Sequence, residues 1–311
     1  MMTDCKQNSK IGVYLLSLFA ILFWGMSYIW RDSLLSMGIP VEYVVFVRIA
    51  IAAVFLLFWN IARGKSLRIH RRDVPKFLLV AMFEPLIYFV TETYGIQLTE
   101  SPTYSSLIIA LGPIFSVLVG VLAFREKITI VNIFGILVCL GGIVLVTMVS
   151  NSVGEAFWMG FLLLVIAVLS EVGNASVTKI LSTRYDPAVI VMYQFLIGSV
   201  YLLPLFVHRG LVGFDASLYL SWKVWKPILC LAILCSGAAF SLWANTIKHL
   251  GVAKSSIFMS TIPVVTALAG WLLGSELLSV KQWIGIILAT LGVGLSQLNA
   301  RAGLFKCKRK S

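Results

Sequence analysis

The sequence predicts an all-α integral membrane protein with ten transmembrane helices, arranged as two inverted five-helix repeats. Three observations predict this class: the composition, a series of apolar runs of spanning length, and an internal repeat. Of the 311 residues, 59% are hydrophobic and 12% are charged, whereas a soluble domain has about 45–50% apolar and about 25% charged residues. So few charges cannot cover a water-facing surface of this size, and the chain is therefore expected in a bilayer.

A membrane-spanning helix needs about 20 mainly apolar residues. Short polar connections separate most of the runs that meet this requirement, so consecutive helices are expected to be antiparallel neighbours. The runs cover residues 11–30, 43–62, 76–94, 103–123, 129–149, 157–178, 188–207, 226–247, 252–274 and 281–299. Strands of a closed β-barrel would be about 9–11 residues long with alternating polarity, and this sequence lacks that pattern.

Residues at one end of three runs, the first, second and seventh, support the assignment of these runs. The run 11–30 is expected to remain as an uncleaved span, because Tyr28, Trp30 and Arg31 stand where a signal-peptide cleavage site would need small residues. Pro40 opens the second run and Pro187 opens the seventh, as expected for proline in the first turn of a helix.

The stretch 105–145 recurs at 255–295, 150 positions later, with 11 identities in 41 ungapped positions. Shared leucines and glycines would be weak support, but two serines, a proline and a glutamate keep the same register. These pairs are Ser105 and Ser255, Ser106 and Ser256, Pro113 and Pro263, and Glu126 and Glu276. A repeated unit of membrane segments is typical of secondary transporters. The first repeat is predicted to cover 1–150 and the second 151–300.

The distribution of basic residues predicts the orientation of the chain. Of 25 Lys and Arg residues, 19 fall in segments on one side of the predicted membrane and five on the other. The side rich in Lys and Arg is normally cytoplasmic, so both termini, including a basic tail at 301–311, are expected there. Because each repeat holds an odd number of helices, the second is inverted, which places Glu126 at the cytoplasmic surface and Glu276 at the outer surface.

The order and doubling of these motifs resemble the EamA family of the drug/metabolite transporter superfamily. The residues that carry the resemblance are Phe23-Trp24-Gly25, Arg48, Ser105-Ser106-Leu107-Ile108, Pro113, Arg125-Glu126-Lys127, Gly135 and Gly141-Gly142, with a second copy at Ser255-Ser256, Pro263 and Glu276. The resemblance implies a ten-helix exporter or exchanger of amino acids, other metabolites or drugs. The expected location is a bacterial cytoplasmic (inner) membrane.

Few ionisable groups fall inside the predicted spans, where each is costly and points to function. The carboxyls are Glu84, Glu92 and Glu171, and Arg48 is the one clearly embedded cation. Glu84 precedes Pro85, which lacks an amide donor and leaves a carbonyl bare one turn earlier. Helical spacing allows Glu84, Tyr88 and Glu92 to face one cavity.

We interpret Glu84 as a proton site or a site for a substrate amine, since burial penalises the charged form of a carboxyl. For Glu92 the alternative is a permanent structural pair with Arg48. Glu171 shares a helix face with Asn174, and these two either face the pathway or form a hydrogen bond between helices.

Other candidates for the substrate or proton pathway are polar or aromatic residues at membrane depth. They are Trp24, Tyr28, Ser105, Ser106, Asn245, Ser255 and Ser256. Trp24 and Tyr28 either stack on a planar substrate or serve packing. Pro85, Pro113 and Pro263 are expected to bend their helices, which frees carbonyls to line a cavity, although such bends also serve packing alone.

The sequence favours a transporter over an enzyme, with a passive facilitator or channel as the main alternative. No histidine or aspartate lies in a span and no Cys-x-x-Cys spacing occurs, so neither a metal site nor a Ser–His pair is expected at membrane depth. No phosphate-binding loop of an ATP-driven pump occurs either. We therefore expect a small-molecule substrate, a lipid bilayer and no cofactor or nucleic acid; a monomer and a homodimer are both open.

Overall fold

The computed structural model describes residues 2–115, 129–149, 154–213, 215–250, 255 and 258–296. Within these ranges the ordered elements are helices, without a strand. Six helical segments are long and apolar enough to cross a membrane, and three shorter apolar helices accompany them. The predicted all-α membrane class is therefore confirmed, while the total of ten spans stays a prediction. Glu126, Ser256 and the basic tail lie outside the described residues.

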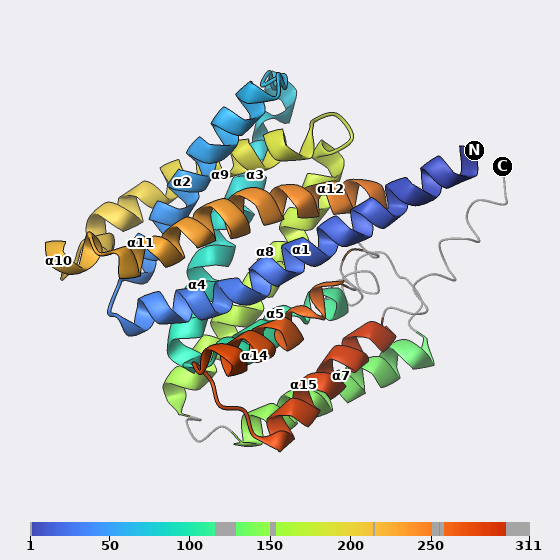
Figure 1. Ribbon diagram of the computed structural model, residues 1–311, viewed down its shortest axis with the longest axis vertical. Helices are drawn as coiled ribbons and strands as arrows, with labels where there is room; N and C mark the ends of the chain where they lie inside the picture. Colours follow the sequence, from blue (N-terminus) through green and yellow to red (C-terminus); the bar gives the residue numbers. More distant parts are fainter. Residues whose placement is uncertain are drawn as a thin grey trace.

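The first repeat begins with the longest helix, which runs diagonally across the molecule in Figure 1. Its elements are α1 (Met2–Ser36), α2 (Val41–Ala62), η1 (Arg71–Asp73), α3 (Val74–Ala81), η2 (Met82–Ile87), α4 (Tyr88–Thr99), α5 (Pro102–Ile109) and α7 (Ile130–Val149). Elements α3, η2 and α4 form one apolar segment, Arg71–Thr99, of spanning length.

The second repeat follows the same order. Its elements are α8 (Glu155–Leu181), α9 (Pro187–Leu205), η3 (Phe206–Gly210), α10 (Ala216–Tyr219), α11 (Trp222–Leu229), η4 (Cys230–Ala239), α12 (Phe240–Leu250), α14 (Ile262–Leu273) and α15 (Val280–Ser296). Elements η2 and η4 are π-helical, and each lies in the third helical segment of its repeat. A π-helical turn inside an α-helix often marks a functional site.

Polar side chains fix the starts of two helices. The Ser101 hydroxyl accepts a hydrogen bond from the Tyr104 amide at the start of α5, and the Asp186 carboxylate accepts one from the Ala188 amide at the start of α9. Both helices have proline at the first position, where its missing amide costs nothing.

The backbone is interrupted where the sequence places its buried prolines. Glu84 has φ −146° and ψ 121°, outside the helical region, immediately before Pro85. The adjacent Phe83 carbonyl accepts a hydrogen bond of 2.7 Å from the Ser170 hydroxyl on α8. The break therefore turns a backbone group toward a helix of the other repeat, as expected when a helix loses a backbone donor.

Pro113 and Pro263 follow matching breaks in the two repeats. A turn at residues 110–111 separates α5 from the helical turn that holds Pro113, and a turn at residues 260–261 precedes α14, which holds Pro263 in its first turn. These turns are 150 residues apart, the same offset as the sequence repeat. The amide of Leu111 bonds the Ile108 carbonyl at 3.0 Å, and the equivalent bond from Thr261 measures 3.1 Å.

The crossing of α7 and α15 shows that the two copies run in opposite directions (Figure 1). Gly135 lies against Gly292, and Gly142 lies against Gly285. A Cβ atom added to Gly142 would lie 2.5 Å from the Gly285 carbonyl oxygen and 2.6 Å from the Ala289 amide nitrogen. The sequence repeat makes Gly135 equivalent to Gly285 and Gly142 equivalent to Gly292. In the structure Gly135 instead contacts Gly292 and Gly142 contacts Gly285, so the equivalent helices α7 and α15 are antiparallel.

The other helices pair across the repeats in the same reciprocal way. Helix α2 packs on its counterpart α9, and α5 packs on α14. The third segment of the first repeat, α4, packs on α8, while the third segment of the second repeat, η4 with α12, packs on α1. The buried core is shared by both halves, so the repeats form one bundle with a site at their junction.

Candidate functional site

A cavity lies where the two repeats meet. Its volume, measured as the space open to the centre of a water molecule, is about 50 Å³. Its polar lining comes from α1, α2, η2, α4, α8 and α9, and consists of Ser27, Arg31, Arg48, Glu84, Tyr88, Glu92, Glu171, Asn174, Thr178 and Gln194. A water molecule needs about 10–15 Å³ of such space. The cavity therefore has room for several water molecules.

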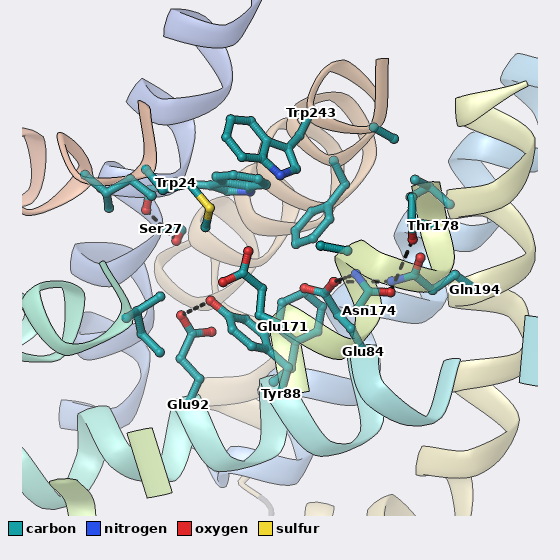
Figure 2. A pocket seen from close by; sticks show the side chains of 18 of the residues that line it. Trp24, Ser27, Glu84, Tyr88, Glu92, Glu171, Asn174, Thr178, Gln194 and Trp243 are labelled. Atoms are coloured by element: carbon teal, nitrogen blue, oxygen red, sulfur yellow. Dashed lines mark hydrogen bonds between the residues drawn. The ribbon is translucent and has the colours of Figure 1, made fainter. Parts of the chain in front are cut away.

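Glu84 is the most enclosed carboxyl of the cavity, with 1% of its surface exposed. Its Oε2 accepts a hydrogen bond of 2.6 Å from the Asn174 amide on α8 and one of 3.4 Å from the Gln194 amide on α9 (Figure 2). Both donors are neutral and belong to the second repeat. The arrangement supplies hydrogen bonds to the carboxyl without fixing a cation beside it.

Glu92 pairs with Arg31, so the alternative of a permanent structural pair with Arg48 is wrong. Arg31 Nη1 contacts Glu92 Oε2, Arg31 Nη2 donates to Oε1 at 3.1 Å, and the Tyr88 hydroxyl donates to Oε1 at 3.0 Å. The predicted apolar run 11–30 ends one residue before Arg31, which places this residue in the outer loop. In the structure α1 continues to Ser36, and Arg31 points into the bundle with 2% of its surface exposed.

Arg48 on α2 contacts a hydroxyl and an aromatic ring. Its Nε and Nη2 donate to the Ser236 hydroxyl at 3.1 and 2.9 Å, and its Cζ lies 4.3 Å from the centroid of the Phe89 ring. Among the described residues, Nη1 has no hydrogen-bond partner although it is buried. The guanidinium is therefore held in place but keeps an unused donor.

Glu171 points into the open part of the cavity, between Glu92 and Trp243 in Figure 2. The backbone of the first repeat comes close to it: a Cβ atom added to Gly112, in the turn before Pro113, would lie 3.0 Å from Glu171 Oε2. The absence of a side chain at residue 112 thus leaves space for the carboxyl.

Aromatic side chains form the apolar wall of the cavity. Trp24 meets Phe240 and Trp243 edge to face, with ring centroids 5.0 and 5.2 Å apart. Tyr28 lines the cavity and lies under Arg31, whose Cζ is 4.6 Å from the ring centroid. These rings offer a surface on which an apolar or planar group can stack.

Seven of the predicted pathway residues line the cavity, namely Trp24, Tyr28, Glu84, Tyr88, Glu92, Glu171 and Asn174. Ser105 and Ser106 are not among the described residues that line it. Ser105 shares a hydrogen bond of 2.8 Å with Thr99, and Ser106 donates to the Thr103 carbonyl at 2.7 Å. Asn245 and Ser255 are also absent from the lining, and Ser255 is buried.

Several lining residues were not predicted from the sequence, although some of them left a signal in it. Gln194 is a polar residue in an apolar run. It aligns with Arg48 when the second helices of the repeats are compared at an offset of 146, which also pairs Ile51 with Ile197. Arg31 could have been found by extending the helical face of Trp24 and Tyr28 beyond the apolar run. Trp243 and Phe240 left no comparable signal, since aromatic residues are common throughout apolar helices.

The described residues contain no group of three or more His, Cys, Asp or Glu side chains placed to hold a metal ion. Cys139, Cys230 and Cys235 are free thiols. The side chains that line the cavity can form hydrogen bonds, ion pairs and stacking contacts.

The comparisons with known proteins agree with this architecture. A protein of Archaeoglobus fulgidus described as an uncharacterized transporter is 26% identical over 273 residues, which cover 88% of this chain and 94% of the relative. A probable terminal-alkyne amino-acid exporter of Streptantibioticus cattleyicolor is 28% identical over 227 residues, covering 72% and 73%. A solved crystal structure with 18% sequence identity superposes with a TM-score of 0.69, and the match covers 94% of this chain and 98% of the other chain. This likeness shows the shared fold.

The family comparison covers both repeats. Residues 11–148 and residues 158–297 each match the EamA-like transporter family. Together with the reciprocal helix packing and the cavity at the junction of the halves, these matches identify a membrane transporter. The chain belongs to the EamA-like transporter family.

Proposed function

We propose that this protein is a secondary transporter that exports or exchanges small metabolites by alternating access. The observation that carries the proposal is the buried polar cavity at the junction of the repeats, lined by side chains from both halves. Secondary transporters built from inverted repeats place their substrate sites near the membrane midplane, at broken helices between the repeats. The breaks at η2, at residues 110–111 and at residues 260–261 suit that arrangement.

Polar contacts join the repeats on both sides of the cavity. On the predicted cytoplasmic side, Lys65 Nζ lies 2.6 Å from Asp186 Oδ2, and the Tyr193 hydroxyl donates to the Leu67 carbonyl at 2.6 Å. On the predicted outer side, the Ser101 hydroxyl donates to Glu276 Oε1 at 2.5 Å. Alternating access requires these contacts to open in turn, as the halves rock around the cavity.

Amino acids, related metabolites and drugs are the proposed cargo. The name of the Streptantibioticus cattleyicolor relative, a probable terminal-alkyne amino-acid exporter, supports amino acids first. The aromatic wall at Trp24, Phe240 and Trp243 suits an apolar portion of such a molecule. The proposed location is a bacterial inner membrane with both termini in the cytoplasm, which the distribution of Lys and Arg supports.

Glu84 is the proposed coupling residue. Its carboxyl is buried in the cavity, and within the described part of the chain it accepts hydrogen bonds only from the neutral amides of Asn174 and Gln194. A carboxyl in such a site can exchange a proton, or a cationic group of the cargo, without first breaking an ion pair. Glu171 faces the same cavity and offers a second carboxyl for the same exchange.

Flux measurements with purified protein in liposomes test this function. Vesicles loaded with unlabelled L-leucine or L-phenylalanine should accumulate the labelled compound by saturable counterflow. Uptake that rises linearly with concentration and shows no counterflow would instead establish a passive channel, which is the alternative. Conversion of the compound into a new product would establish an enzyme and overturn the transporter proposal.

A further inference from the structure

Two buried arginines line the cavity, and their surroundings differ in charge. Arg31 meets the Glu92 carboxylate, which neutralises it. Arg48 is equally buried, with 2% of its surface exposed, yet among the described residues no carboxylate lies within ion-pair distance of it. A buried charge without a counterion is strongly unfavourable. The uncompensated cation of Arg48 therefore needs an explanation.

The inverted repeat supplies the comparison. Gln194 is the counterpart of Arg48 in the second repeat and donates to Glu84, which lies on π-helical η2. Arg48 donates in turn to Ser236, which lies on π-helical η4. The two contacts are reciprocal, because the second helix of each repeat reaches the π-helical element in the third helical segment of the other. In the first contact the neutral Gln194 amide donates to the Glu84 carboxyl. In the second the Arg48 guanidinium donates to the neutral Ser236 hydroxyl.

The unused donor of Arg48 shows how an anion would bind. Nε and Nη2 both point to the Ser236 hydroxyl, the Phe89 ring lies beside the guanidinium, and Nη1 is buried without a partner. Because Arg48 lines the cavity, an anionic group in the cavity can reach this donor. Arginine binds planar carboxylates better than other cationic side chains do, because its donors form a rigid fork.

We propose that Arg48 is the carboxylate subsite of the cavity, so that the cargo carries a carboxylate beside an apolar or aromatic portion. The bound carboxylate then lies beside Arg48, as the Glu84 carboxyl lies beside Gln194 in the reciprocal contact. The aromatic rings of Phe89 and Phe240, which also line the cavity, receive the apolar portion. This inference rests on the proposed transport function and narrows its substrate class.

Binding to matched probes tests the subsite. Purified protein in nanodiscs is titrated with L-phenylalanine, L-leucine and phenylacetate, each beside the corresponding carboxamide, and thermal stability is recorded. Ligand binding raises stability by mass action. We expect a carboxylate to bind the wild-type protein on the order of tenfold or more tightly than its amide, since a hydrogen bond to a charged group is the stronger kind. Equal stabilisation by the two members of every pair would overturn the proposal.

Two substitutions probe the subsite from opposite directions. Arg48→Gln should remove the preference for carboxylates over amides. Ser236→Asp should place a carboxylate against Arg48, as Glu84 is placed against Gln194, and should raise the stability of the ligand-free protein while abolishing carboxylate binding. Ser241→Ala is the control and should keep the preference, because the Ser241 hydroxyl donates to the Gly237 carbonyl of its own helix and is not part of the cavity lining. A Ser236→Asp protein that binds carboxylates as tightly as wild type would contradict the assignment, even if Arg48→Gln fails to fold.

Flux in liposomes separates failure of the subsite from failure of the transport function. If wild type exchanges amides and carboxylates at equal rates, the protein is a transporter but Arg48 is no carboxylate site. If carboxylates bind through Arg48 but no compound crosses the membrane, the subsite stands and the transport function falls.

Discussion

Arg31 on α1 and Glu92 on α4 form a buried ion pair inside the bundle, each with 2% of its surface exposed. Ser27 and Tyr88 complete the network, since Ser27 Oγ accepts from Arg31 Nη2 at 3.1 Å and the Tyr88 hydroxyl donates to Glu92. All four residues belong to the first repeat. The pair therefore ties α1 to α4 beside the cavity and neutralises two charges that would otherwise be exposed to a low dielectric.

Removing one partner of this pair should lower the free energy of unfolding more than removing both partners does. Arg31→Ala or Glu92→Ala leaves an uncompensated buried charge and should cost about 3–5 kcal/mol of unfolding free energy. The double variant Arg31→Met with Glu92→Leu removes both charges and should be close to neutral. Denaturant titration in detergent measures the three variants. Single variants as stable as wild type would show that the pair does not contribute to stability.

Glu84→Gln tests the coupling residue. Glutamine keeps the size of the side chain and its capacity to accept from Asn174, so the protein should fold and insert normally. It cannot carry a titrating proton, so exchange in liposomes should lose its dependence on pH. Glu155→Gln, at an exposed position in the first turn of α8, is the matched control and should keep that dependence. Unchanged pH dependence in Glu84→Gln would remove Glu84 from the coupling mechanism.

The crossing of α7 and α15 can be tested with two adjacent glycines. Gly142→Ala places a Cβ atom against the backbone of α15, whereas a Cβ atom at Gly141 meets nothing within 4 Å. Backbone cannot move aside as a flexible side chain does, so Gly142→Ala should destabilise the protein by about 1–3 kcal/mol. Gly141→Ala should be neutral. A thermal melt of both variants decides the matter, and equal melting temperatures would refute the close helix approach.

The contact between Lys65 and Asp186 should make stability depend on pH. Partial burial of Asp186 opposes ionisation, but the hydrogen bonds from Lys65 and from the Ala188 amide outweigh it and lower the pKa of the Asp186 carboxyl below its usual value. A carboxyl with a lowered folded-state pKa stabilises the fold above its unfolded pKa of about 4. That contribution is lost as the pH falls through the folded-state pKa.

Asp186→Asn should therefore lower stability at pH 7, and the difference from wild type should shrink as the pH falls below about 4. Melting temperatures of both proteins across the pH range measure this. The control variant is Asp215→Asn, which leaves the contact between the repeats intact. Hydrogen bonds from Ser217 in the same turn also lower the pKa of the Asp215 carboxyl. A constant difference between Asp186→Asn and wild type at every pH would exclude the ionised carboxylate as its cause.

The amino-acid sequence by itself determined the membrane class, the repeat and the set of carboxyls that lie at membrane depth. Each of these depends on composition or on spacing along one chain segment. The scarcity of charge excludes a water-facing surface, and the register of Pro113 with Pro263 marks equivalent breaks. These local properties survive whatever the helices pack against.

The tertiary structure alone decided which groups meet. Glu92 takes Arg31 as its partner, Glu84 takes Asn174 and Gln194, and Arg48 takes a hydroxyl. Each partner lies on another helix, and the rotation and depth of that helix are set by packing of the whole bundle. The apolar run around residues 11–30 ended one residue before Arg31, and only packing of α1 against α4 showed that this residue turns inward.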